Sequence, residues 1–249
     1  MWEWLRPRLV RVEVVLAGLP AAFEGLTIGH LSDLHRGPLV PPRLLARGVD
    51  LLREQAPDLI ALTGDFVSVS GRYAPSVAQI LSPLRARLGV YAVLGNHDHR
   101  EGPARISRAL EAVGIEMLTN RAVRLGLEGW VVGVDDVNEG NPLPEQAMAG
   151  IPCQDFTILL CHQPDFAVEA AGLGINLQLS GHSHGGQLEL PWLGRLVLPE
   201  QAVLYPAGLA RVAATDTWVY TNVGLGIVTA PIRYRCPPEV AVLTLKRAK

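Results

Sequence analysis

Short runs of apolar residues alternate with segments of helical periodicity along the first half of the chain. Three runs consist of apolar residues that end in polar ones, the pattern of a buried strand: 26–33, 58–66 and 89–98. Two segments place apolar residues at helical spacing behind an early proline: 41–57 and 74–88, the second interrupted by Pro83. A further helix is expected from about Pro103 to Val113. Strands that alternate with helices predict an α/β fold.

The second half of the chain is richer in strand-like segments. The expected strands are residues 121–127, 130–137, 156–162, 175–182, 187–191, 217–224 and 240–246, with helical turns near 142–149 and 165–172. Val10, Val12 and Val14 alternate with charged residues, which indicates a strand near the N-terminus. Because the sequence shows no internal repeat, low-complexity tract or linker, we expect one domain over residues 1–249.

Composition and charge disfavour some classes of protein. The net charge is −2, so there is no basic excess to bind a polyanionic backbone, and no nucleic-acid partner is expected. Cys153, Cys161 and Cys236 are odd in number and scattered along the chain. A disulfide framework is therefore disfavoured, and buried, inert thiols in a reducing compartment are expected.

The N-terminal segment leaves two interpretations open. The uncharged run over residues 14–23 is about half as long as the roughly 20 residues that span a bilayer. Trp2 and Trp4 stand beside two arginines, and these residue types anchor proteins at a membrane surface. A frayed terminus that packs its tryptophans on the body is the alternative. We expect a cytoplasmic protein and leave peripheral contact with the inner membrane open.

Polar residues suited to metal binding follow the strand-like runs. They are Asp33 and His35, Asp65, Asn96 with His97 and Asp98, His162, and His182 with His184. Ligands bind at the carboxyl ends of strands in open α/β sheets, so these positions indicate a functional site. Imidazole, carboxylate and amide oxygen without thiolate suit Mn, Fe, Zn, Co or Ni. These ligands are too many for one tetrahedral ion, and two divalent metal ions are expected.

The spacing within two motifs supports this interpretation. In an extended segment residues i and i+2 share one face, so Asp33 points together with His35 and His182 with His184. Glycines beside the ligands let the backbone turn sharply and approach the site closely. Each motif alone is weak, because Gly-Asp is ordinary turn chemistry and a carboxylate at a strand end is common. Five motifs in one order, each after an apolar run, are much more specific.

The combination resembles the calcineurin-like metallophosphoesterase superfamily, whose pattern runs DxH, GDxxD, GNH[DE], H and GHxH. The segments "GHSHGGQ" and "TNVGLGIVTAPIRYRCPPEV" are similar to a small bacterial branch. That branch includes membrane-associated phosphodiesterases and a pyrophosphatase that acts on UDP-diacylglucosamine. The resemblance implies a four-layer α/β/β/α sandwich of two mixed sheets flanked by helices. One position departs from the pattern, since Ser68 stands at the second aspartate of GDxxD, which puts support around the metal ligands in doubt.

The resemblance also implies a role for each motif residue. The implied metal ligands are Asp33, His35 and His184 for one ion, Asn96, His162 and His182 for the other, and Asp65 as the bridge. His97 donates a proton to the leaving oxygen or stabilises the transferring phosphoryl group, and Asp98 orients its ring. Arg36 is a candidate for a forked contact to a phosphate oxygen, with an exposed surface arginine as the alternative. His99 either reaches the substrate or lies in a solvated loop.

The expected activity is binuclear-metal-dependent hydrolysis of phosphodiester or diphosphate bonds by attack of a metal-bridging hydroxide, with manganese favoured. The alternatives are a phosphomonoesterase or protein phosphatase, and a catalytically idle metal-binding scaffold. We expect a small-molecule or lipid-linked phosphoester substrate, and the candidate loops that select it are residues 35–42, 66–76 and 188–211. Within the second loop, the run "LPWLGRLVLP" forms either a wall for an acyl chain or a core strand.

Overall fold

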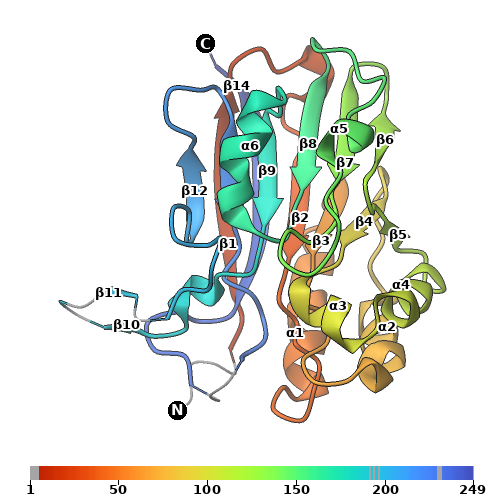
Figure 1. Cartoon of the computed structure of the whole chain (residues 1–249), viewed down its shortest axis with the longest axis vertical. Coiled ribbons are helices and arrows are strands. Elements are labelled where there is room, and N and C mark those ends of the chain that lie inside the picture. Colours follow the sequence, from red (N-terminus) through yellow and green to blue (C-terminus); the bar gives the residue numbers. More distant parts are fainter. Residues whose placement is uncertain (1–5, 191, 193, 196, 229–231, 249) are drawn as a thin grey trace.

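The structure, a computed structural model, describes residues 6–190, 192, 194–195, 197–228 and 232–248. Within these residues, two six-stranded mixed sheets pack face to face (Figure 1). The first sheet runs in the order β1 (Arg8–Leu16), β14 (Glu239–Arg247), β2 (Thr27–Leu31), β3 (Leu59–Thr63), β4 (Val90–Val93) and β5 (Glu116–Met117). The second runs in the order β12 (Gly208–Arg211), β13 (Trp218–Thr221), β9 (Leu177–Ser180), β8 (Phe156–Leu160), β7 (Gly129–Gly133) and β6 (Arg121–Leu125). A separate pair consists of β10 (Glu189–Leu190) and β11 (Gly194–Arg195).

The central strands of the first sheet are parallel and covered on both faces. β2, β3 and β4 pair in parallel, and every residue of β3 is buried, as expected for a continuous apolar run in such a position. The helices on the outer face are α1 (Pro42–Arg53), α2 (Ala74–Leu81) and α4 (Pro103–Glu111). α1 has Pro42 in its first turn, where no N–H donor is needed, and α2 ends before Pro83.

Apolar clusters fill the space between the two sheets and the space behind each of them. The cluster between the sheets contains Ile28 and Ala61 from the first sheet and Ile158 and Leu179 from the second. Behind the second sheet, apolar residues pack under α5 (Pro144–Ala147) and α6 (Ala167–Gly172), which Figure 1 shows lying over that sheet. This arrangement confirms the expected four-layer α/β/β/α fold class.

Most expected strands and helices are present, mostly with shorter bounds, although β14 extends one residue beyond each end of the expected 240–246. The structure adds β5, β12 and the helix α3 (Asn96–Glu101), which begins where a strand end was expected. Short 3-10 helices are η2 (Ala21–Phe23), η3 (Gly71–Tyr73), η4 (Pro164–Phe166) and η5 (His184–Gly186). Parallel β2, β3 and β4 end at one edge of their sheet, and β8 and β9 end beside them, so their following loops meet.

Three other expectations have different outcomes. Cys161 and Cys236 are buried as expected, but the expectation is wrong for Cys153, which is exposed in the loop before β8. Trp2 and Trp4 lie outside the described residues, and the single domain over residues 1–249 stays a prediction. In the described part of the chain, no helix combines the length and apolar character needed to cross a membrane.

Candidate metal centre

The loops that follow the strands turn through left-handed backbone conformations. Five expected metal ligands have positive φ: Asp33 (49°), His35 (47°), Asp65 (56°), His182 (67°) and His184 (50°). Each such conformation costs roughly 1–2 kcal/mol for a residue with a Cβ, and strain of this kind persists mainly at functional sites. The expectation that each histidine shares an extended face with its partner is therefore wrong. β2 and β9 end earlier, and tight turns bring the side chains together.

The first group of ligands joins the two sheets. Ligand atoms of Asp33, His35, Asp65 and His184 all lie within 4.8 Å of one another, and all four residues are buried. His35 Nε2 is 3.0 Å from His184 Nε2 and 3.4 Å from Asp65 Oδ2. His184 Nε2 is in turn 3.4 Å from Asp33 Oδ1. Two imidazoles and two carboxylates thus converge on one point, as the coordination of a divalent cation requires.

The second group shares Asp65 with the first. Ligand atoms of Asp65, His162 and His182 lie within 4.8 Å of one another. His162 Nε2 is 3.3 Å from Asp65 Oδ2 and 3.2 Å from His182 Nδ1. Asn96 Oδ1, beside them, is buried and accepts no hydrogen bond from any described residue. A buried amide oxygen without a partner is costly, so a cation at this point would satisfy it.

Backbone carbonyls determine which ring nitrogen of His162 and of His182 is free to bind a metal ion. His162 Nδ1 lies 2.7 Å from the carbonyl oxygen of Thr63, and His182 Nε2 lies 2.9 Å from that of Glu200. A carbonyl only accepts hydrogen bonds, so both of these nitrogens carry a proton. The lone pairs therefore belong to His162 Nε2 and His182 Nδ1, the two atoms that face the second group.

Burial keeps three of the histidines neutral. It lowers the pKa of His35 to about 3 and that of His182 to about 4, and holds the pKa of His184 well below its usual value. His162 differs: burial lowers its pKa, but the attraction of Asp65 through its charge and hydrogen bond, together with the charges of Asp33 and Asp136, raises that pKa to about 10. The same attraction holds the pKa of Asp65 below its usual range despite burial. Protons and divalent cations therefore compete for the space between His162 and Asp65.

Two glycines let the loops approach closely enough to form both groups. A Cβ on Gly95 would lie 2.3 Å from Asp65 Oδ1 and 2.8 Å from His162 Nε2. A Cβ on Gly181 would lie 2.4 Å from Asp33 Oδ2. These close approaches are the role that the sequence predicted for the glycines. Together with the oxygen and imidazole donors, they fit a pair of divalent cations that share Asp65.

His97 lies at the edge of the two groups. Its backbone N–H donates to Asp65 Oδ1 at 2.9 Å, and its Nδ1 is 3.1 Å from the carbonyl oxygen of Ser68. The ring meets that of His35 edge-on, with centroids 4.8 Å apart. Nδ1 donates to the carbonyl, and Nε2 makes no hydrogen bond within the described residues. This nitrogen is therefore available to a bound molecule.

Asp98 does not orient the His97 ring, which corrects the role that the resemblance implied. Its carboxylate accepts the backbone N–H groups of Phe66, Val67 and Gly95, so it fixes the ligand loops. Burial, followed by repulsion from Asp65, raises the pKa of Asp98 to about 7. Ser68 supplies the missing orientation through its carbonyl, and its Oγ donates to the carbonyl oxygen of His35 at 3.0 Å. Although Ser68 replaces the second aspartate of the family pattern, it still supports His35 and His97.

Arg233 is a neighbour of the site that the sequence did not single out. It is buried, and its Nη2 lies 3.4 Å from His184 Nδ1 while donating to the carbonyl oxygens of Val223 and Gly226. These bonds tie the C-terminal loop to a ligand histidine. The available signal was the pair of arginines, Arg233 and Arg235, that follows the last glycine-rich turn.

Sequence comparison agrees with this geometry. A calcineurin-like phosphoesterase family profile matches residues 26–186, more than half of the chain and all of the expected metal ligands. The chain belongs to the calcineurin-like phosphoesterase family.

Several relatives of this phosphoesterase cover most of its length. It is 34% identical over 235 residues to the metallophosphoesterase YkuE of Bacillus subtilis, covering 92% of this chain and 82% of that protein. It is 34% identical over 224 residues to the phosphodiesterase YaeI of Escherichia coli, covering 86% and 80%. A transmembrane protein with metallophosphoesterase domain from Danio rerio is 33% identical over 259 residues, covering 97% of this chain but 58% of that protein.

Solved structures share the fold at low sequence identity. TT1561 of Thermus thermophilus superposes with a TM-score of 0.56 at 17% identity, covering 81% of this chain and 90% of that one. A dimetal phosphatase from Danio rerio gives a TM-score of 0.54 at 13% identity, covering 90% and 93%. At these identities the likeness shows the fold alone.

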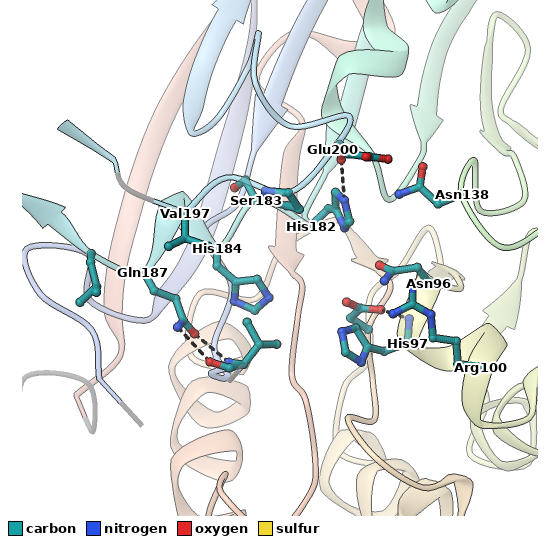
Figure 2. Close-up of a pocket in the computed structure, with 15 residues that line it drawn as sticks. Asn96, His97, Arg100, Asn138, His182, Ser183, His184, Gln187, Val197 and Glu200 are labelled. Atoms are coloured by element: carbon teal, nitrogen blue, oxygen red, sulfur yellow. Dashed lines mark hydrogen bonds between the residues drawn. The ribbon is translucent and has the colours of Figure 1, made fainter. Parts of the chain in front are cut away.

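A cavity of about 480 Å³ opens over the metal ligands of the phosphoesterase. Its lining includes Arg100 and Asn138, called the polar wall, and Leu188, Val197, Pro199 and Val228, called the apolar wall. Figure 2 shows Arg100 and Asn138 across the cavity from Val197, with His182 and His184 between them. Part of the 188–211 loop thus lines the cavity, as the sequence predicted, whereas no residue of the other candidate loops, 35–42 and 66–76, is among the lining residues.

Two other sequence candidates lie elsewhere. Arg36 donates to the carbonyl oxygens of Gly37 and Val40 and stacks on the ring of Tyr73, and it does not line the cavity. This geometry does not support the expected phosphate contact. His99 Nε2 lies 2.7 Å from Asp135 Oδ1 in a mostly buried pair, so neither the substrate contact nor the solvated loop is correct.

The run "LPWLGRLVLP" does not form a core strand in its described residues. Trp192 is fully exposed, and Val197 is 67% exposed at the mouth of the cavity. Residues 191, 193 and 196 lie outside the described part of the chain. The short pair β10 and β11 is separate from both sheets, so of the two alternatives for this apolar run the core strand is wrong.

Proposed function

We propose that this phosphoesterase is a binuclear metal-dependent hydrolase of phosphodiester or diphosphate bonds, with manganese as the favoured metal. The observation that carries the proposal is the position of Asp65 Oδ2. It lies 3.4 Å from His35 Nε2 and 3.3 Å from His162 Nε2, and so belongs to both ligand groups. The two groups would hold two divalent ions there, which would supply activation of a water molecule and neutralisation of charge on the phosphoryl oxygens.

His97 is the proton donor to the leaving oxygen in this proposal. Its Nδ1 is occupied by the carbonyl oxygen of Ser68, and its backbone N–H is held by Asp65, so the ring has a fixed position at the cavity. Nε2 can then carry a proton to an oxygen that leaves on that side. General acid catalysis of this kind contributes about 10²–10⁴ in rate.

The two walls of the cavity favour a substrate with a substituent on each side of the reacting phosphorus. Phosphodiesters and diphosphates have two such substituents, whereas a monoester has one. The relative YaeI of Escherichia coli is named a phosphodiesterase at 34% identity, which supports the same class here. A phosphomonoesterase or protein phosphatase is the alternative, and the complete ligand set disfavours an idle metal-binding scaffold.

The apolar wall supports a small-molecule or lipid-linked phosphoester as the substrate. An alkyl or acyl substituent would remove the exposed Val197 and its neighbours from water, as in the bacterial branch that handles UDP-diacylglucosamine. The exposed Trp192 beside this wall supports peripheral contact of a cytoplasmic protein with the inner membrane. We propose no nucleic-acid partner, because the net charge is −2.

The test compares Asp65→Ala with Asp50→Ala, a control that removes an exposed carboxylate on α1. After manganese loading, metal content and turnover of bis(p-nitrophenyl) phosphate are measured. Asp65→Ala should lose metal and at least about 1000-fold of the rate, since metal activation of the water depends on it, while Asp50→Ala should match the wild type. Near-normal turnover by Asp65→Ala after chelation and manganese readdition would overturn the assignment. Faster turnover of phosphopeptide monoesters than of diesters would favour the protein phosphatase.

A further inference from the structure

Arg100 presents an unused donor edge to the cavity. Its Nε and Nη2 both donate to Glu139 Oε1, at 2.9 and 2.5 Å. Nη1 makes no hydrogen bond within the described residues. Arg100 also carries the one permanent positive charge among the described residues that line the cavity. Figure 2 shows its guanidinium extending toward Asn96 and His97.

The position of Arg100 is set by the helix that carries a metal ligand. Asn96 and Arg100 are four residues apart on α3, so they lie on the same helical face with Cβ atoms about 5–6 Å apart. Both residues line the same cavity, so the guanidinium lies beside the metal ligands on this face (Figure 2). When one phosphoryl group lies over the ligands, a second one linked to it can extend toward Arg100.

Asn138 is held on the same wall as Arg100 by a buried carboxylate (Figure 2). Asp136 Oδ1 accepts the backbone N–H groups of Asn138 at 3.0 Å and of Glu139 at 2.8 Å. Asp136 is fully buried, and its Oδ2 accepts Gln163 Nε2 at 2.6 Å. These bonds fix the loop backbone, while the Asn138 side chain lines the cavity and makes no hydrogen bond to a described residue. Its amide is thus a second available donor on the polar wall.

Glu139 competes only weakly with a bound anion for the Arg100 guanidinium. Side chains of Arg100 and Glu139 are 51% and 36% exposed, and an exposed ion pair contributes about 0–1 kcal/mol. A phosphoryl group offers several anionic oxygens to a guanidinium, which binds them with charge-assisted hydrogen bonds. The pair with Glu139 therefore positions Arg100 without occupying the edge that faces the cavity.

We propose that Arg100 and Asn138 form a second anion subsite, which makes diphosphates the substrate class of this phosphoesterase. This inference rests on the function proposed above. Water adds to the phosphorus over the metal ligands and releases one proton to solvent, and the bond from that phosphorus to the bridging oxygen breaks. The second phosphoryl group leaves with that oxygen and both electrons of the bond. His97 supplies the proton to the bridging oxygen, and Arg100 neutralises the charge of the departing group.

The test measures binding of AMP and ADP, which differ by one phosphoryl group, to manganese-loaded protein by calorimetry after excess metal is removed. The wild type should bind ADP more tightly than AMP. Arg100→Ala should weaken ADP binding about tenfold, the loss of a charge-assisted hydrogen bond, and AMP binding less than twofold. Asn138→Ala should change ADP binding in the same direction by less. The matched control is Arg108→Ala, an exposed arginine on α4 that bonds to its own helix.

Two results would overturn the subsite. One is equal binding of AMP and ADP by the wild type, and the other is an unchanged ADP preference in Arg100→Ala. Turnover of bis(p-nitrophenyl) phosphate by the same preparations separates this inference from the proposed function. That diester carries no second phosphoryl group, so its turnover by the wild type and by the Arg108→Ala control reports on the metal ligands and His97 rather than on the second anion subsite. Absent turnover by the wild type would instead count against the proposed function.

Discussion

The floor and the walls of the cavity are built in opposite ways. The metal floor consists of Asp33, His35, Asp65, Asn96, His162, His182 and His184, each at most 6% exposed. The walls contain Arg100, whose side chain is 51% exposed, and Val197, which is 67% exposed. The floor is fixed by the packed sheets, whereas the walls are loops at their edge. The chemistry of the protein is therefore tied to the fold, and the choice of substrate is tied to surface segments that can change without affecting it.

Hydrogen bonds between neighbouring loops explain the rigidity of the floor. The backbone N–H of Asp33 donates to Gly64, that of His35 to Asp65, and that of Gly181 to His162. Each ligand loop is therefore held by the loop beside it, across both sheets. On the apolar wall, β10 and β11 pair over only two residues each, so little of the fold supports that segment.

His97→Ala is the sharpest way to separate the two regions, because His97 belongs to the cavity but coordinates no metal in this arrangement. The variant should keep its metal and lose about 10²–10⁴ in rate with aryl esters that have poor leaving groups. The loss should be smaller for p-nitrophenolate, which needs little protonation. A leaving-group series and metal analysis of the same preparation measure both effects. Equal losses along the series would show that His97 is not the acid.

Gly95→Ala tests whether the floor depends on close backbone approach. The added Cβ would lie 2.3 Å from Asp65 Oδ1, so the shared ligand must move. Manganese affinity should fall about 10–100-fold, as when support of a ligand is lost, with lower turnover in proportion. Gly172→Ala on α6 is the control, because its Cβ meets no atom within 4 Å. Unchanged manganese affinity in Gly95→Ala would mean that the ligand loops can shift to accommodate the added Cβ, and that the floor is less rigid than its packing indicates.

The metal floor could be predicted from the sequence because each ligand follows an apolar run. Asp65 stands out after a continuous buried strand, and the paired histidines after β9 stand out in the same way. The turns that bring them together could not be predicted, since alternation in a strand says nothing of left-handed conformations beyond its end. Partners such as the carbonyl oxygens of Thr63 and Glu200 also leave no signal, because every residue has a carbonyl.

The walls were less predictable, as two arginines illustrate. Arg36 and Arg100 each follow a ligand motif closely in the sequence. Arg36 turns onto Tyr73 and the carbonyl oxygens of its own loop, whereas Arg100 extends into the cavity. Which way a long side chain points depends on the packing of neighbouring loops, and spacing along the chain does not contain that information.

Val228→Ser should change substrate choice without affecting the floor. The substitution makes the apolar wall more polar, so KM for a diester with an octyl group should rise about 3–10-fold, while KM for the methyl analogue stays constant. Val203→Ser is the control, since Val203 is similarly apolar and exposed but does not line the cavity. Steady-state kinetics with the two esters provides the measurement. An equal rise in KM for both esters would show that Val228 affects the metal floor rather than the binding of the octyl group.

His99→Gln should have the smallest effect, a pH-dependent loss of stability where α3 meets the loop of the polar wall. The hydrogen bond to Asp135 raises the pKa of His99 above its usual 6.5. A raised pKa in the folded state stabilises the protein fully below about pH 6.5, and this contribution is lost as pH rises through the folded value. The wild type should therefore exceed the variant by about 1 kcal/mol at pH 6, and by less at pH 9. Urea unfolding of both metal-free proteins at pH 6 and pH 9 gives the four free energies of unfolding. Groups that the two proteins share contribute equally at each pH, so they cancel when the variant is subtracted from the wild type. If the stability difference between wild type and variant instead grew toward pH 9, His99 would not be stabilised in its charged form. The contact between α3 and the polar wall would then be a neutral one.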